Sequence, residues 1–185
     1  MENNIDINNG LSMGNNRGTI IFNTITQRES KLRKILDIML SQEIDESTTQ
    51  DLSKYDTEEY TIENKILFNC LDDDWTEILY DFVSFETIID NALVDDENGI
   101  SQKSRFLKKL RNDYKKAKKE LGILNNQEEI CKNSTKILDL IQQYHMEFLK
   151  INGENKEHYD ENCISILVAF GFIECKILEK PINYK

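Results

Sequence analysis

The sequence predicts an all-α protein, a helical bundle of about five to six helices with a disordered Asn/Gly-rich N-terminal tail and one short β-strand. Apolar residues recur at spacings of three and four over several long stretches, which is the periodicity of an amphipathic helix. Proline occurs once and seven glycines are spread thinly along 185 residues, fewer turn residues than an all-β fold needs. A chain of this length can bury a sizeable core without disulfides or metals.

The N-terminal segment combines a polar tail with a short β-prone run. Residues 1–17 are rich in Asn and Gly and bury too little apolar surface to fold, so disorder is expected. Residues 19–24 favour β-structure, but a strand this short is not stable alone. It must pair within the molecule or with a neighbouring protein, so Ile20, Ile21 and Phe22 are candidate partner-binding residues. Packing against the first helix is the competing interpretation.

The helices can be placed from their apolar periodicity and their end signals. They are expected to cover residues 27–43, 62–71, 75–94, 102–120, 127–150 and 157–178. Thr26 and Glu29 have the spacing of a capping box. Ser101 starts a basic helix, and Gly122 has the position of the glycine that ends it. The centre of the last helix is apolar nearly all round, which predicts a buried central helix.

These elements divide the chain into three parts. Residues 1–25 form a flexible tail with the short strand. Residues 26–59 hold an N-terminal helix and a polar, aperiodic linker. Residues 60–181 form the helical domain, and no internal repeat is visible in the sequence.

Acidic and basic residues are segregated in a chain whose net charge is −11. Residues 72–97 hold ten acidic residues and no Lys or Arg, whereas residues 101–119 hold nine basic residues and one acidic residue. A short turn joins the two stretches, so they are expected to lie antiparallel and to attract each other. The competing interpretation is a docking patch formed by Lys108, Lys109, Arg111, Lys115 and Lys116. Nucleic acid is the less favoured partner because the rest of the chain repels phosphate.

The sequence lacks the signatures of catalysis and of ion binding. It has no phosphate-binding loop, no dinucleotide fingerprint and no nucleophile elbow. The acidic run at 72–74 has no phosphate loop beside it, and a calcium loop starting at Asp95 would need Glu where Phe106 stands. His145 and His158 are the only histidines, and neither has a recognisable catalytic context. We therefore expect no enzymatic activity, catalytic residue, cofactor or metal.

The cysteines and the N-terminus bear on location. Cys70, Cys131, Cys163 and Cys175 form no C-x-x-C pair. The N-terminus has neither the basic region nor the apolar run of a signal peptide, and no stretch approaches the roughly 18 apolar residues of a membrane span. Reduced thiols, a cytoplasmic location and no membrane association are expected.

Three further segments carry a family resemblance. They are Tyr60–Asn69, which opens the helical body, the basic stretch SRFLKKLRNDYKKAKKEL at 104–121, and the apolar ending at 163–181. Together they resemble the helical C-terminal domain found in bacterial ABC-three-component systems, which are regarded as anti-phage conflict machinery. Those systems combine an SMC-like ATPase, a small middle component and an effector that carries this domain. The resemblance covers roughly residues 60–181 and implies a docking domain with no catalytic residues.

The expected function is a non-enzymatic interaction subunit of a bacterial anti-phage defence complex that bridges or docks an effector to an SMC-like ATPase. No nuclease, protease or membrane effector is fused to the domain here, which suits a bridging subunit or a decoy of the docking site. The apolar last helix also predicts a homodimer. The alternative is an acidic inhibitor or antitoxin-like protein that blocks a nucleic-acid enzyme, and the acidic block at 72–97 favours it.

Overall fold

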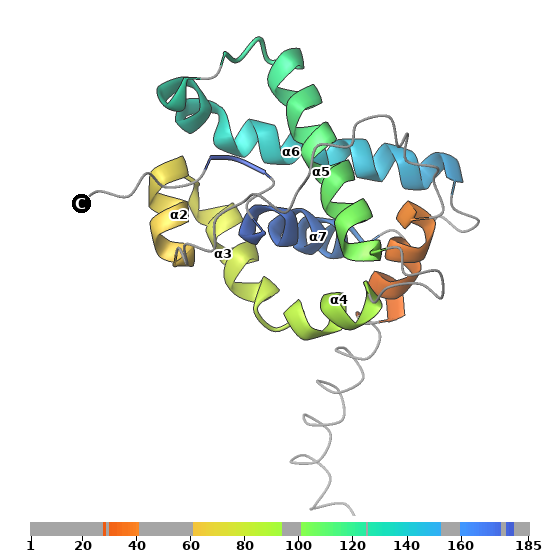
Figure 1. Cartoon of the computed structure of the whole chain (residues 1–185). Coiled ribbons are helices and arrows are strands. Elements are labelled where there is room, and N and C mark those ends of the chain that lie inside the picture. The colour runs from red at the N-terminus through yellow and green to blue at the C-terminus, as the bar shows by residue number, and fades with distance from the viewer. Residues whose placement is uncertain are drawn as a thin grey trace, which may run out of the picture.

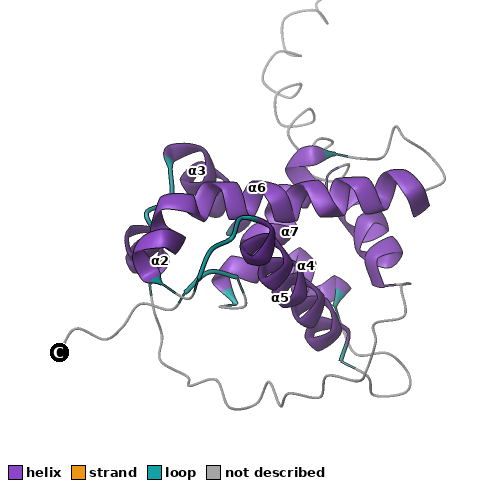
Figure 2. Ribbon diagram, turned by 90° about the horizontal axis from the view of Figure 1, so that it is seen from above, coloured by secondary structure: helices purple, strands orange, loops and turns teal. Residues whose placement is uncertain are grey.

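The protein is all-α over the part of the chain that its structure, a computed structural model, describes. That part comprises residues 28, 30–40, 61–93, 101–124, 126–152, 160–174 and 177–179. It consists of helices joined by loops and contains no strand (Figure 2). The predicted all-α class is therefore confirmed, while the predicted tail and strand at 1–25 and the linker at 45–59 lie outside the described residues.

Helix α7 lies at the centre of the molecule, and the other helices pack around it (Figure 1). The chain runs through a helix at 30–40, then α2 (Ile62–Asn69), α3 (Asp73–Phe82), α4 (Glu86–Ala92), α5 (Gln102–Glu120), α6 (Gln127–Asn152) and α7 (Glu161–Ile173). Helices α3, α5 and α6 all contact α7, and α5 also crosses the long helix α6. Every residue of α7 from 163 to 172 is buried, so the predicted central helix is confirmed. No helix among the described residues is both long enough and apolar enough to cross a membrane.

The predicted ends of α5 are confirmed by its capping contacts. The Ser101 hydroxyl accepts a hydrogen bond from the Ser104 N–H at 3.2 Å, which satisfies one of the free donors of the first turn. Gly122 has a φ of 67°, and the N–H groups of Gly122 and Ile123 donate to the carbonyls of Lys119 and Lys118. This is the Schellman arrangement, in which a left-handed glycine closes the helix.

The single helix predicted over 75–94 is wrong, because a turn at residues 83–85 separates α3 from α4. In this turn the Phe85 N–H donates to the Phe82 carbonyl at 2.7 Å. No Gly or Pro marks the break. Phe85 and Ile89, at the turn and in α4, are 5% and 0% exposed, so the apolar stripe of α3 continues into the core across the break.

The predicted antiparallel pairing of the acidic and basic stretches is also wrong for α3, which packs on α7, whereas α5 packs on α6. An ion pair between the two stretches joins Lys103 Nζ to Asp90 Oδ1 at 3.0 Å. The main attraction that positions α5 and α3 is burial of their apolar faces, since exposed ion pairs contribute only about 0–1 kcal/mol each.

Beyond α7 the chain turns back over the bundle, so the predicted last helix at 157–178 is too long. We call residues 177–179 the C-terminal strap. The Ile177 N–H donates to the Gly171 carbonyl at 3.3 Å, and Ile177 and Leu178 are 0% and 4% exposed. A Cβ atom on Gly171 would lie 2.5 Å from Leu110 Cδ1 and 2.8 Å from Ile177 Cδ1. Glycine therefore lets Leu110 of α5 and Ile177 of the C-terminal strap pack directly on the backbone of α7, and a larger residue would require both side chains to shift.

Candidate functional site

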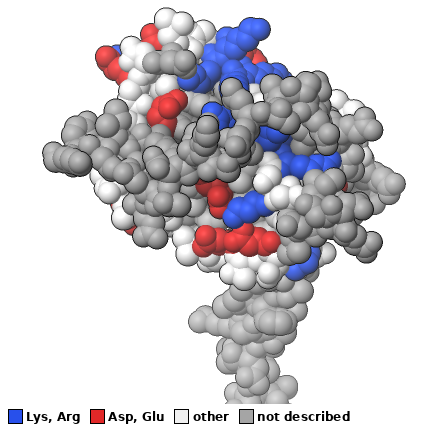
Figure 3. Space-filling model, in the orientation of Figure 1, with Lys and Arg blue, Asp and Glu red and all other residues white. Residues whose placement is uncertain are grey.

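One face of α5 presents a row of cations directed away from the core. Lys108, Arg111, Lys115 and Lys119 follow one another at spacings of three or four residues, so they form one stripe on the helix. We call these four residues the basic ridge. Lys115 and Lys119 are exposed, and Lys108 and Arg111 are half-buried. Lys and Arg side chains gather over α5 on the face drawn in Figure 3.

The basic ridge repels itself. Like charges three or four residues apart destabilise a helix by about 0.2–0.5 kcal/mol per pair. Within the described part of the chain, no carboxylate lies within ion-pair distance of Lys108, Lys115 or Lys119. A partner with opposite charge would relieve this repulsion, which makes the basic ridge the strongest candidate for a docking surface on α5.

The other two basic residues predicted for docking on α5 contact aromatic rings of α6. Lys109 Nζ lies 4.9 Å from the ring centroid of Phe148, and Lys116 Nζ lies 3.6 Å from that of Tyr144. Cation–π contacts at exposed sites are worth about 0.5–1 kcal/mol. Lys109 and Lys116 therefore help to hold α5 against α6, whereas the remaining predicted residues of α5 lie on the basic ridge.

A hollow between α3, α6 and α7 is lined by six acidic side chains and by one basic side chain, that of Arg28. Its two adjoining cavities, of about 340 Å³ and about 260 Å³, share Asp74, Ile78 and Asn162 in their walls. We call this hollow the acidic groove, and its carboxylates belong to Asp72, Asp74, Glu77, Asp81, Asp139 and Glu161. No three His, Cys, Asp or Glu side chains among the described residues are grouped so that they could hold a metal ion. The acidic groove carries charge without a built ion site.

Asp72 and Asp139 are the carboxylates of the acidic groove that join α3 to α6. Asp72 caps α3 by accepting the Trp75 N–H at 3.0 Å, and its second oxygen accepts the Thr135 hydroxyl of α6 at 2.8 Å. The Trp75 indole N–H donates to Asp139 at 2.9 Å. These bonds hold α3 against α6 and fix one wall of the acidic groove.

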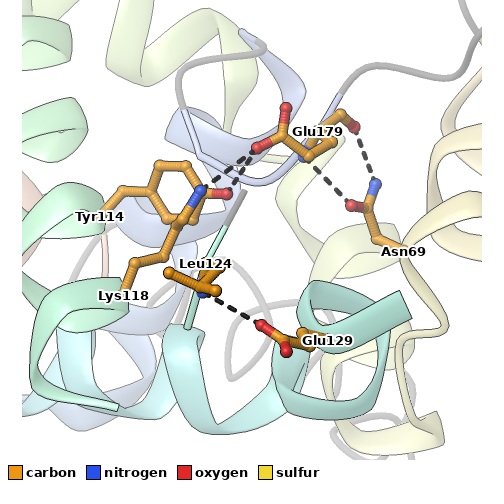
Figure 4. Close-up of polar contacts among 6 residues, drawn as sticks. All are labelled: Asn69, Tyr114, Lys118, Leu124, Glu129 and Glu179. Carbon is orange, nitrogen blue, oxygen red and sulfur yellow. Dashed lines mark hydrogen bonds and ion pairs between the residues drawn. The ribbon is translucent and has the colours of Figure 1, made fainter. Parts of the chain in front are cut away.

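The C-terminal strap is fastened to α2 by Asn69, a fully buried residue (Figure 4). The Asn69 amide oxygen accepts the Glu179 N–H at 3.1 Å, and the amide nitrogen donates to the Glu179 carbonyl at 2.9 Å. The side chain thus pairs with the strap through both its donor and its acceptor. The Glu179 carboxylate accepts the Tyr114 hydroxyl at 2.9 Å and lies 3.7 Å from Lys118 Nζ. Burial raises the pKa of Tyr114, so this hydroxyl remains a donor.

Helix α2 also contacts the end of α7. Lys65 is 2% exposed, and its ammonium donates to the Phe172 carbonyl and lies 4.2 Å from the centroid of the Phe172 ring. The carbonyl therefore compensates a charge that would otherwise be costly to bury. Lys65 and Asn69, one turn apart, fix α2 to both α7 and the C-terminal strap.

The prediction of reduced thiols is wrong for two cysteines, because Cys70 and Cys131 form a disulfide with a Cα–Cα distance of 5.1 Å. This distance lies in the usual range for disulfides. The bond joins the end of α2 to the first turns of α6. Cys163 is free and buried, and burial raises the pKa of its thiol to about 11. Cys175 lies outside the described residues.

A buried histidine and a carboxylate meet between α5 and α6. His145 Nε2 lies 3.4 Å from Asp113 Oδ2, and neither atom has a hydrogen-bond partner among the described residues. Burial lowers the pKa of His145 to about 3 and raises the pKa of Asp113 to about 6. With His145 only 1% exposed, the pair cannot meet a substrate, and it bears on stability instead.

Asp113→Asn should therefore change the pH dependence of stability. The folded state binds the Asp113 proton more tightly than the unfolded chain, so this group favours folding at low pH. That contribution is lost as pH rises from about 4 to about 6. Relative to wild type, the variant should gain about 1–3 kcal/mol between pH 4 and pH 8. Urea unfolding at both pH values measures this difference, with the exposed Asp37→Asn as control. If the difference in free energy of unfolding between variant and wild type is the same at both pH values, burial does not penalise the ionised Asp113 carboxylate.

The predicted site residues Ile20, Ile21 and Phe22 lie outside the described residues, as does His158. Sequence reasoning missed Asn69 as the anchor of the C-terminal strap. No local pattern marks this residue, since its partner Glu179 is 110 positions away.

Comparison with protein-family models, curated proteins and solved structures finds no match to this chain.

Proposed function

We propose that this chain is a non-enzymatic protein-binding subunit that docks an acidic partner on the basic ridge. The observation that carries the proposal is the row of four cations on α5, three of which (Lys108, Lys115 and Lys119) form no ion pair with a carboxylate among the described residues. The chain keeps this self-repelling row although its net charge is −11. Such a row offers electrostatic complementarity, which speeds association and excludes partners of like charge.

A protein partner suits this surface better than nucleic acid does. The basic ridge is a single short stripe, and the acidic groove lies on the same molecule. Its carboxylates would repel a long phosphate backbone, whereas a compact acidic patch on a protein can contact the ridge alone. The affinity should fall with added salt in either case, so salt dependence by itself does not separate the two partners.

A more specific proposal for the biological role of the subunit follows from the resemblance at residues 60–181. In it, the chain is a cytoplasmic, homodimeric subunit of an anti-phage defence complex, and its partners are an effector and an SMC-like ATPase. The disulfide removes the cysteine argument for a cytoplasmic location, so this part of the proposal rests on the resemblance alone. An ATPase that binds through the basic ridge would support it.

The test compares two triple variants that carry the same net charge. Lys108→Glu, Lys115→Glu and Lys119→Glu together reverse the basic ridge. Lys34→Glu, Lys136→Glu and Lys150→Glu change three exposed lysines elsewhere. Tagged copies are expressed in the native host, and the bound proteins are quantified by mass spectrometry.

The ridge variant should lose its main partner by at least about tenfold, as expected when several interfacial charges are reversed, while the control variant keeps it. Equal capture by both variants would contradict docking on the basic ridge. Capture of nucleic acid instead of protein would contradict the class of partner. Circular dichroism of both variants checks that the fold is unchanged.

A second function, an acidic inhibitor of a nucleic-acid enzyme, is favoured by the acidic groove. Glu77 and Asp81 are exposed along α3 and line the groove together with Asp74. Reversing Asp74, Glu77 and Asp81 to Lys should abolish inhibition of a target enzyme if this function holds. Unchanged inhibition by this variant would rule the groove out as the inhibitory surface.

A further inference from the structure

The Cys70–Cys131 disulfide begins at an exposed residue at the end of α2. Cys70 is exposed and Cys131 is half-buried. Cys70 follows α2 as its C-cap with a φ of 51°, in the left-handed region that non-glycine residues adopt at a cost. Exposed disulfides are the ones that exchange most readily with thiols in solution. Accessibility thus distinguishes this bond from a buried structural disulfide.

We call the turn between α2 and α3, which includes Cys70, the elbow. Three side chains of α6 hold the elbow without covalent bonds. Gln127 Nε2 donates to the Phe68 carbonyl at 2.8 Å. The Ser134 hydroxyl shares its one proton between the Cys70 carbonyl at 3.3 Å and the Cys131 carbonyl at 3.2 Å. The bond from Thr135 reaches α3 as described above. These residues lie on the same face of α6 as Cys131. They would keep the two sulfur atoms within reach of each other after the disulfide opens, so the bond can form again.

The elbow is also where the C-terminal strap is anchored. Asn69, whose amide pairs with the backbone of Glu179, immediately precedes Cys70. A covalent bond that fixes Cys70 against α6 therefore also limits the movement of Asn69. Opening that bond leaves the strap held by an α2 end that is tied to α6 only by hydrogen bonds.

We propose that Cys70 is a thiol-exchange site that takes low-molecular-weight thiols, and that opening of its bond to Cys131 loosens the C-terminal strap. This inference stands apart from docking on the basic ridge. In the first step, a thiolate attacks the sulfur of Cys70, a new S–S bond forms between them, and Cys131 leaves as a thiolate. In the second step, a second small thiolate attacks the small-molecule sulfur of the mixed disulfide on Cys70. The small-molecule disulfide leaves, Cys70 becomes a thiolate, and the two protein thiolates take up protons from solvent.

The reverse sequence closes the bond. A low-molecular-weight disulfide reacts with the Cys70 thiolate and gives the adduct with release of one thiolate. Cys131 then attacks the Cys70 sulfur and displaces the second small thiolate. Cys70 is thus the sulfur that carries the adduct, and Cys131 is the thiol that resolves it. Cys163 takes no part because it is 1% exposed.

The chemistry can be tested with glutathione and glutathione disulfide on the folded protein, read by peptide mass spectrometry. In wild type, Cys70 and Cys131 should pass between disulfide and dithiol as the ratio changes, while Cys163 stays unmodified. In Cys131→Ser the glutathione adduct should accumulate on Cys70. In the matched variant Cys70→Ser, adduct formation on Cys131 should be at least about tenfold slower, because Cys70 is the more exposed of the two residues and exposed thiols react faster.

The coupling to the strap can be tested by amide hydrogen exchange of wild type with and without reduction. The Glu179 N–H, which donates to Asn69, should exchange at least about tenfold faster when the disulfide is open. An amide in the middle of α5, that of Leu110, should not change and serves as control. Wild type alone suffices for this test, so it remains valid if a cysteine variant fails to fold.

Three results would overturn the inference. One is a disulfide that stays closed in folded wild type at every ratio of thiol to disulfide. Another is an adduct that forms on Cys131 as fast as on Cys70. The third is a Glu179 amide whose exchange is the same in both redox states.

Discussion

Replacing Phe170 with Ala should lower the free energy of unfolding by about 3–5 kcal/mol, the usual cost of deleting a buried aromatic ring. Phe170 is 1% exposed and sits on α7 with its ring centroid 6.0 Å from that of Phe82 and 6.1 Å from that of Phe106. Its removal would leave a cavity where α3, α5 and α7 meet. Because small domains have only about 5–15 kcal/mol of stability in total, the variant should be close to unfolding.

Urea unfolding followed by circular dichroism measures this loss, and Ile151→Ala is the matched control. Ile151 is 81% exposed on α6, so its truncation should change stability by less than about 0.5 kcal/mol. If Phe170→Ala costs less than about 1 kcal/mol, the surrounding helices can collapse onto α7. The ring would then not be the centre of the core.

The helices whose ends are set by local chemistry were predicted from the sequence most closely. The predicted range 102–120 coincides with α5, because Ser101 caps its first turn and Gly122 closes its last. The start of α6 at Gln127 also agrees with its predicted start. Capping residues act on a few neighbouring residues, so they can be recognised in the sequence without knowledge of the tertiary fold.

Two errors have a common cause in tertiary packing. The turn between α3 and α4 contains no Gly or Pro, and Phe85 and Ile89 are buried on either side of it, so the apolar pattern runs through the break. The end of α7 is hidden because Ile177 follows Ile173 at a helical spacing of four residues, although Glu174 and Lys176 lie between them. In both places periodicity continues past the point where the chain changes direction, since periodicity records burial and not direction.

The candidate surface was predicted only in part for a similar reason. The sequence identifies α5 as basic, but it does not say which side of α5 faces another helix. The crossing with α6 decides this, since it places Lys109 over Phe148 and Lys116 over Tyr144. The cations on the opposite side then form the basic ridge. Pairing of cysteines 61 positions apart likewise depends on which helices meet.

The disulfide should account for a large share of stability, as expected for a bond that closes a long loop. Its cysteines are 61 positions apart, and a loop of that length corresponds to about 4 kcal/mol in the chain-entropy model, with about 2–4 kcal/mol typically observed. The double variant Cys70→Ser, Cys131→Ser should therefore unfold at a markedly lower urea concentration than oxidised wild type. Wild type unfolded in reductant should lose a similar amount.

The decisive comparison adds reductant to both proteins. Reductant should destabilise wild type and leave the double variant unchanged, because only the former has a bond to lose. A wild type whose unfolding midpoint does not move in reductant would mean that the bond is absent or does not constrain the unfolded chain. If the loss is well below about 2 kcal/mol, the hydrogen bonds from Gln127 and Ser134 hold the elbow largely by themselves.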